Sequence, residues 1–105
     1  AMPRWGLTDK PDKNQAAIVE RLRELGYYVL IAKRPLDLWV VEPTGQAAAW
    51  VEIKSHLGAA MTNQEADFFD ECPERHRIIA YTAEDVVAHF DSLSLPAIKV
   101  KRFHT

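Results

Sequence analysis

Two acids and a lysine near the middle of the chain have the types and spacing of a hydrolytic site. Asp37 lies in one short apolar segment, and Glu52 and Lys54 lie two residues apart in the next. Side chains alternate along a strand, so Glu52 and Lys54 share one face if their segment is extended. Carboxylates beside a lysine can bind a divalent cation and hold an attacking water, which is the chemistry of phosphodiester hydrolysis.

The turn between the two segments sets how close the acids lie. Residues 43–46, Pro-Thr-Gly-Gln, predict a four-residue hairpin loop in which Glu42 pairs with Ala47. Counting from that pair places Asp37 directly opposite Glu52, with Cβ atoms about 4.5–5.5 Å apart. Two carboxylates at that distance repel each other unless a cation compensates, which predicts a site for Mg²⁺ or Mn²⁺.

The same residues also allow a purely structural interpretation. An acid on each of two neighbouring strands, with a lysine nearby, can form an exposed sheet face with an ordinary ion pair. Such a pair is worth less than about 1 kcal/mol. Spacing alone leaves both interpretations open.

The residues before Asp37 predict a helix followed by a strand. Asp12 and Gln15 have the spacing of a capping box, and Gly26 ends the helix. The continuous aromatic and aliphatic run at 27–32 indicates a buried strand. The apolar stripe expected along the helix consists of Ile18, Leu22 and Leu25.

Further elements follow the third strand. Thr62 and Glu65 form another capping box, at the start of a helix that runs to about Cys72. A strand over 77–81 comes next, and Thr82 can cap a last helix. The side chains expected to be buried are Phe68 or Phe69 in the first of these helices and Val86, Val87 and Phe90 in the second.

The order of these elements, α-β-β-β-α-β-α, predicts an α/β domain with a central mixed sheet flanked by helices. Residues 97–102 favour a further short strand at the end of the chain. The four main strands are expected over residues 27–32, 36–42, 47–54 and 77–81.

The ordered set of motifs resembles the PD-(D/E)xK nuclease superfamily. More narrowly, it resembles small phage and prokaryotic nucleases of the VRR-NUC type and their Holliday-junction-resolvase-like relatives. The likeness covers about residues 9–91, and its centre is Asp37 followed, after fourteen residues, by Glu52-Ile53-Lys54. The other matching segments are 14–19 (Asn-Gln-Ala-Ala-Ile-Val), 22–26 (Leu-Arg-Glu-Leu-Gly), 36–41 (Leu-Asp-Leu-Trp-Val-Val) and 61–65 (Met-Thr-Asn-Gln-Glu).

This resemblance implies a restriction-endonuclease-like core, dependence on Mg²⁺ with Mn²⁺ as a substitute, and hydrolysis of DNA. Carried over by position, Asp37 and Glu52 would ligate the metal, with the Ile53 carbonyl as a third ligand. Lys54 would position or activate the water. Gln64 matches a glutamine that these nucleases often place near the metal or the phosphate.

The chain departs from the family pattern in two places. Leu36, not proline, directly precedes Asp37, and Pro35 lies one position earlier. Many relatives carry an acid on the first helix, where this chain has Gln15, so the sequence leaves open whether the site holds one metal or two. Around the site, the residues expected to form a basic rim that contacts DNA phosphates are Lys33, Arg34 and His56.

The composition favours one small cytoplasmic domain without membrane contact. The 105 residues carry 13 Lys and Arg against 15 Asp and Glu, a net charge of −2, so DNA binding requires a local basic patch. One cysteine, Cys72, fits a reducing compartment, and no apolar run reaches the roughly 18–20 residues of a membrane span. Ala1, which precedes Met2, is expected to be a cloning remnant. The expected parts are a loop at 1–11, a nuclease core at 12–91 and a tail at 92–105.

These observations favour a metal-dependent DNA endonuclease. One alternative is a structure-selective junction resolvase, and another is a catalytically silent nucleic-acid-binding or assembly module on the same fold. A chain of this size covers little of a duplex, which favours a homodimer, although the sequence does not indicate the face that would form it.

Overall fold

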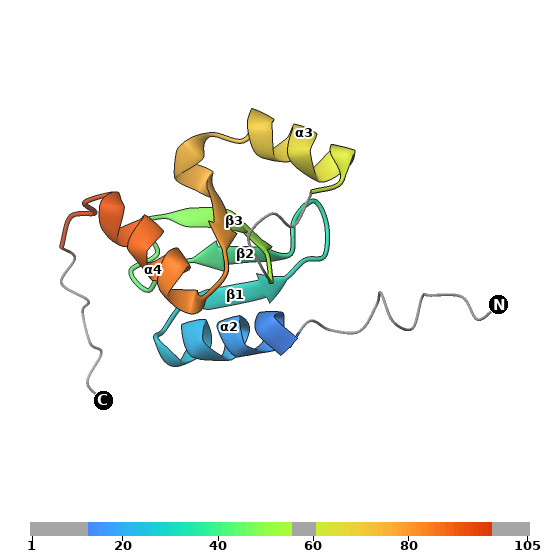
Figure 1. The fold of residues 1–105 in the computed structure, drawn as a ribbon. Coiled ribbons are helices and arrows are strands. Elements are labelled where there is room, and N and C mark those ends of the chain that lie inside the picture. The colour runs from blue at the N-terminus through green and yellow to red at the C-terminus, as the bar shows by residue number, and fades with distance from the viewer. Residues whose placement is uncertain (1–12, 56–60, 98–105) are drawn as a thin grey trace.

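The computed structural model describes residues 13–55 and 61–97 and contains a four-stranded sheet with flanking helices (Figure 1). The order along the chain is helix, three strands, helix, strand and helix, as predicted, with one short 3₁₀ helix, η1, before the last strand. The strands are β1 (Tyr28–Ile31), β2 (Leu38–Val41), β3 (Ala48–Ile53) and β4 (Arg77–Ala80). The helices are α2 (Lys13–Glu24), α3 (Asn63–Glu71), η1 (Glu74–His76) and α4 (Ala83–Ser92).

The sheet is mixed, with the spatial order β1-β2-β3-β4. The first three strands form an antiparallel meander, and β4 runs parallel to β3 after the chain has crossed through α3 and η1. In the β2–β3 hairpin Val41 lies opposite Ala48, and the Glu42 N–H donates to the Ala47 carbonyl at 3.0 Å. The pairing expected from the four-residue loop is therefore confirmed.

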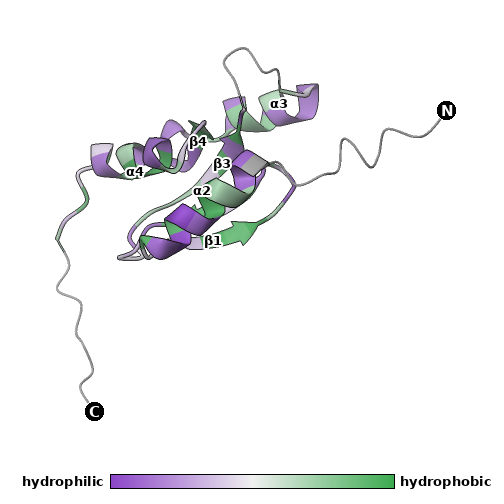
Figure 2. Ribbon diagram, turned by 60° about the horizontal axis from the view of Figure 1, so that its bottom comes forward, coloured by the Kyte–Doolittle hydropathy of each residue, from purple (hydrophilic) through white to green (hydrophobic). Residues whose placement is uncertain are grey.

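The hydrophobic core lies between one face of the sheet and the helices α2 and α4 (Figure 1, Figure 2). Leu25, expected on the core stripe of α2, is 40% exposed. The helix ends at Glu24, so Leu25 turns away with the chain, and Val19 is buried on the helix instead. The largest fully buried side chains of the described residues are Ile18, Leu22, Leu36, Leu38, Val40, Val51 and Val86.

Strand β1 is an exposed edge strand, so the prediction of a buried strand at 27–32 is wrong. Of its four residues Val29 alone is buried, while Tyr28, Leu30 and Ile31 are exposed. A continuous apolar run is typical of a strand covered on both faces. Here α2 covers one face, and the described residues provide no cover for the outer edge or for most of the other face.

Helix α3 lies on the sheet face opposite the core and is held by contacts at its surface. The Phe68 ring meets the Trp50 ring edge-on at 5.8 Å, and the Arg77 guanidinium lies 4.8 Å from the centre of the Phe69 ring. Arg77 also donates to the Phe69 carbonyl at 2.6 Å. Neither phenylalanine is fully buried, contrary to prediction, because α3 covers only part of this face.

Capping boxes begin α3 and α4. The Thr62 hydroxyl accepts from the Glu65 N–H at 3.1 Å, and the Glu65 carboxylate accepts from the Thr62 N–H at 2.9 Å, as predicted. Thr82 caps α4 in the same way, with Asp85 as its partner.

Some sequence expectations fall partly outside the described residues. Asp12, the expected cap of α2, lies outside them, and so does the part of the expected strand at 97–102 that follows Ala97. At the other end of α2, Gly26 has φ of +92°, a left-handed conformation that suits glycine at a helix end.

Within 13–55 and 61–97, no helix has the length and apolar character of a membrane span.

The turn of the β2–β3 hairpin is organised by one buried acid. Glu42 is 7% exposed, and its carboxylate accepts from the Thr44 hydroxyl and from the Gln46 N–H, the latter at 2.8 Å. Burial alone would raise the pKa of Glu42, but hydrogen bonds from Thr44, Gln46 and Ala47 outweigh it and hold the pKa below its usual range.

We expect Glu42→Gln to destabilise the protein by about 1 kcal/mol at pH 7, because the charged acceptor is lost. A carboxyl with a lowered folded pKa contributes stability above its unfolded pKa of about 4.3 and loses it as pH falls through the folded value. The difference between the two proteins should therefore shrink below about pH 4. Urea unfolding at pH 7 and pH 3 measures this difference, and an equal difference at both values would contradict the assignment.

Candidate functional site

The structure brings Asp37 and Glu52 together at one end of the β2–β3 hairpin. Leu38 lies opposite Val51, so the same register continued by one residue sets Asp37 opposite Glu52. The Asp37 carboxylate accepts from the Ile53 N–H at 2.8 Å, and its charge acts on Glu52. The two acids expected from the sequence therefore share one site.

Asp37 is fixed by the loop between β1 and β2. Its carbonyl accepts from the N–H groups of Ala32 and Lys33, at 2.9 and 3.3 Å, which closes the loop on itself. Lys33 has φ of +66° within this turn. Leu36 is fully buried and anchors the residue before the acid.

Glu52 is a buried acid with an unsatisfied oxygen. The residue is 3% exposed, and its Oε2 atom lies 3.1 Å from Lys54 Nζ. Its Oε1 atom receives no hydrogen bond from the described residues. Burial, followed by the charge of Asp37, raises the pKa of Glu52 to about 8, against the opposing effect of Lys54.

Hydrogen bonds at both the N–H and the carbonyl fix the backbone of Lys54. Its N–H donates to the Ala80 carbonyl at 3.0 Å, and its carbonyl accepts from the Asn14 side chain at 3.1 Å. The same Asn14 amide donates to the Tyr81 carbonyl at 3.1 Å, so it ties the start of α2 to the ends of β3 and β4. The sequence alone gives Asn14 no role, because the two carbonyls to which its side chain donates lie far away along the chain.

Glu65 is a third acid at the site. Burial raises the pKa of Glu65, but hydrogen bonds from Thr62, a hydrogen bond from the protonated Glu52 carboxyl and the charge of Lys54 together lower it. These interactions place its carboxylate beside Glu52 and Lys54. The sequence located Glu65 at the start of a helix, but its capping role already accounted for the residue.

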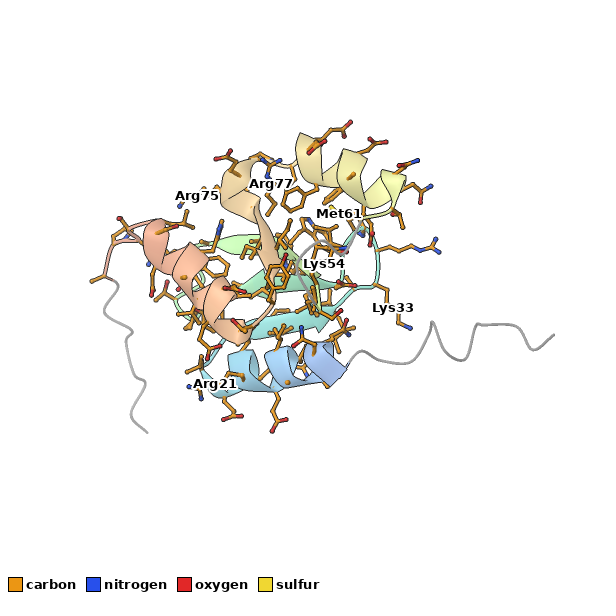
Figure 3. All side chains as sticks on the ribbon, in the orientation of Figure 1. Arg21, Lys33, Lys54, Met61, Arg75 and Arg77 are labelled. Carbon is orange, nitrogen blue, oxygen red and sulfur yellow. The ribbon has the colours of Figure 1, made fainter. Side chains whose placement is uncertain are left out.

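A pocket of about 300 Å³ has Glu65, the third acid, in its lining. Lys33, Arg34 and Pro35 of the β1–β2 loop line it on one side, and Thr62, Gln64 and Glu65 of the α3 N-terminus line it on the other. Figure 3 shows Lys54 between the sheet and α3, and Lys33 on the loop after β1. Three residues expected at the site, Lys33, Arg34 and Gln64, thus surround one pocket.

The remaining expected site residues are placed as follows. The Ile53 side chain points into the core, and the role of its carbonyl as a ligand stays a prediction. His56 lies outside the described residues. Trp39 and Trp50, whose rings lie 5.0 Å apart, pack against each other on the sheet face that carries Glu52.

The site offers a cation the buried carboxylate of Glu52 and the half-buried carboxylate of Asp37 rather than a complete shell of side chains. Within residues 13–55 and 61–97, no three His, Cys, Asp or Glu side chains are arranged to hold a metal ion. A hydrated ion needs fewer protein ligands, since Mg²⁺ usually keeps several waters and takes one or two carboxylates. The unsatisfied Oε1 of Glu52 fits that requirement.

Comparison with known proteins identifies no relative. No family model, no curated protein and no solved structure matches the chain.

The raised pKa of Glu52 predicts a pH dependence of stability in the metal-free protein. Between the unfolded pKa of about 4.3 and the folded pKa of about 8, the folded state holds the proton more tightly than the unfolded state. The free energy of unfolding should therefore fall as pH rises through this window. We expect Glu52→Gln to remove about 2 kcal/mol of that fall, as measured by urea unfolding from pH 5 to 8 in EDTA. Glu42→Gln serves as the control and should keep the wild-type slope; a wild-type slope in Glu52→Gln would contradict the assignment.

Proposed function

We propose that this protein is a metal-dependent DNA endonuclease with a restriction-endonuclease-like core of the PD-(D/E)xK type. The observation that carries the proposal is the Glu52 carboxylate, buried beside Asp37 and Lys54 with one oxygen unsatisfied. A buried acid in this state reduces stability, and such acids are concentrated at functional sites. The order of elements and the hairpin register fit the superfamily that the sequence resembles.

The acid pair fits a divalent cation. Asp37 and Glu52 would hold the ion, with the Ile53 carbonyl as the third protein ligand. When bound, the ion would neutralise charge on the phosphate and lower the pKa of an attacking water. Binding would also displace the proton that the raised pKa of Glu52 retains, offset the repulsion between the two ionised carboxylates and give Glu52 Oε1 a partner.

Lys54 supplies a positive charge at the same place. Its Nζ atom is buried 3.1 Å from Glu52, on a backbone fixed by Asn14 and by Ala80. From there the ammonium can hold a water or a phosphate oxygen. The nearby Glu65 balances the Lys54 charge when Glu52 is engaged with a cation.

Lys33 and Arg34 provide the contact with DNA. They line the pocket beside the acids, with the Gln64 amide on its other wall. Because the net charge of the chain is −2, attraction of DNA phosphates depends on local cations such as these two. The pocket therefore extends the acid site along the proposed path of a DNA strand.

We expect Asp37→Ala, Glu52→Ala and Lys54→Ala each to lower DNA cleavage by at least about 100-fold, because each removes charge stabilisation from the transition state. The assay is cleavage of plasmid and of short duplexes in Mg²⁺ or Mn²⁺, with EDTA as the metal-free control.

Two further variants keep this test specific. Glu42→Gln changes a buried acid outside the site and should cleave like the wild type. Replacing Lys33 and Arg34 with alanine should weaken DNA binding without changing metal dependence. A wild-type protein that binds DNA but cleaves neither substrate with either metal would contradict the proposal and support a silent binding module.

A further inference from the structure

Exposed apolar side chains are concentrated at one edge of the sheet. Four of the five large ones among the described residues lie on β1 or in the turn that leads to it. Figure 2 shows β1 as a hydrophobic strand at the rim of the sheet, beside α2. Apolar surface gathered in one place marks an interaction site. The five are Leu25, Tyr28, Leu30 and Ile31 at this edge, and Ile79 on β4.

A groove of about 650 Å³ runs beside this edge, between α2 and β1. Ala16 and Val19 of the helix and Ile31 of the strand form its apolar lining. Glu20 and Arg23 of the helix also line it. The groove therefore has an apolar floor with charges of both signs at its margin.

The outer edge of β1 presents backbone groups that no strand of the described residues pairs with. The Ala32 N–H donates inward to the Asp37 carbonyl, so residues 28, 30 and 32 bond toward β2 and residues 29 and 31 face outward. The Arg23 guanidinium donates to the Val29 carbonyl at 2.9 Å, which confirms that this carbonyl points away from the sheet. The strand contains no lysine, proline or other residue that natural edge strands use against pairing.

We propose that a second copy of this chain occupies the surface, by antiparallel pairing of the two β1 strands about a two-fold axis at Leu30. In this register Val29 of each copy lies opposite Ile31 of the other, and the outward backbone groups of both residues are used. The neighbouring register would pair Ile31 with Tyr27. The Tyr27 N–H already donates to the Leu22 carbonyl at 3.0 Å, so that register forms fewer hydrogen bonds.

The side chains and charges are complementary in this arrangement. Val29 and Ile31 share the sheet face covered by α2, so Ile31 of each copy enters the groove of the other. The two α2 helices run antiparallel across the axis, which sets Arg23 of one copy toward Glu20 of the other. The N–H of Ile31 replaces Arg23 as the donor to the Val29 carbonyl. This interface does not rest on the proposed function.

Cysteine cross-linking tests the register. Leu30 faces its own copy as a non-hydrogen-bonded pair with Cα atoms about 4.5 Å apart, within the range of a disulfide. In a Cys72→Ser background, Leu30→Cys should give a covalent dimer under mild oxidation. Tyr28→Cys is the matched control, since Tyr28 lies on the same face but about 13 Å from its copy, and it should stay monomeric. Failure of Leu30→Cys to cross-link, or equal cross-linking by both variants, would overturn the proposal.

Sedimentation velocity tests the interface without a cross-link. The wild type should form a dimer whose fraction rises with protein concentration, and Ile31→Glu should be monomeric with an unchanged circular dichroism spectrum. Ile79→Glu, at the opposite edge of the sheet, should keep the dimer. A wild type that stays monomeric at high micromolar concentration, or a dimer that survives in Ile31→Glu, would overturn the proposal.

Discussion

The Glu52 carboxylate is held in the interior against the charge of Asp37, and the surrounding structure is what keeps it there. The β2–β3 hairpin fixes the two acids by its register, and Lys54 supplies a counter-charge at 3.1 Å. One carboxylate oxygen still lacks a donor among the described residues. Burial of that oxygen costs stability, and a bound cation would recover the cost.

Contacts from three separate parts of the chain converge on this arrangement. Asn14 ties α2 to the ends of β3 and β4, which sets the backbone at Lys54. Arg77 holds the end of α3 through the Phe69 carbonyl and ring. The start of α3 then places Glu65 beside the buried acid. A helix with no fully buried residue can thus still be positioned accurately enough to contribute to the site.

Local sequence patterns correctly predicted the features that depend on short-range geometry, such as the hairpin register. A four-residue turn determines the hairpin register, so the approach of Asp37 and Glu52 could be counted from the sequence. The roles of Asn14 and Glu65 depend on contacts between distant segments, which neither spacing nor capping patterns reveal. The exposure of β1 was missed for a similar reason. A continuous apolar run looks the same in the sequence whether its strand lies inside the sheet or at its edge.

Metal binding in the absence of DNA tests the central claim most directly. Titration of the EDTA-treated protein with Mn²⁺, followed by calorimetry or by the electron paramagnetic resonance signal of free Mn²⁺, measures the occupancy of the acid pair. The account predicts saturable binding to the wild type, retained in Glu42→Gln and lost in Glu52→Gln while that variant remains folded. No saturable binding to the wild type, or equal binding by Glu52→Gln, would contradict it.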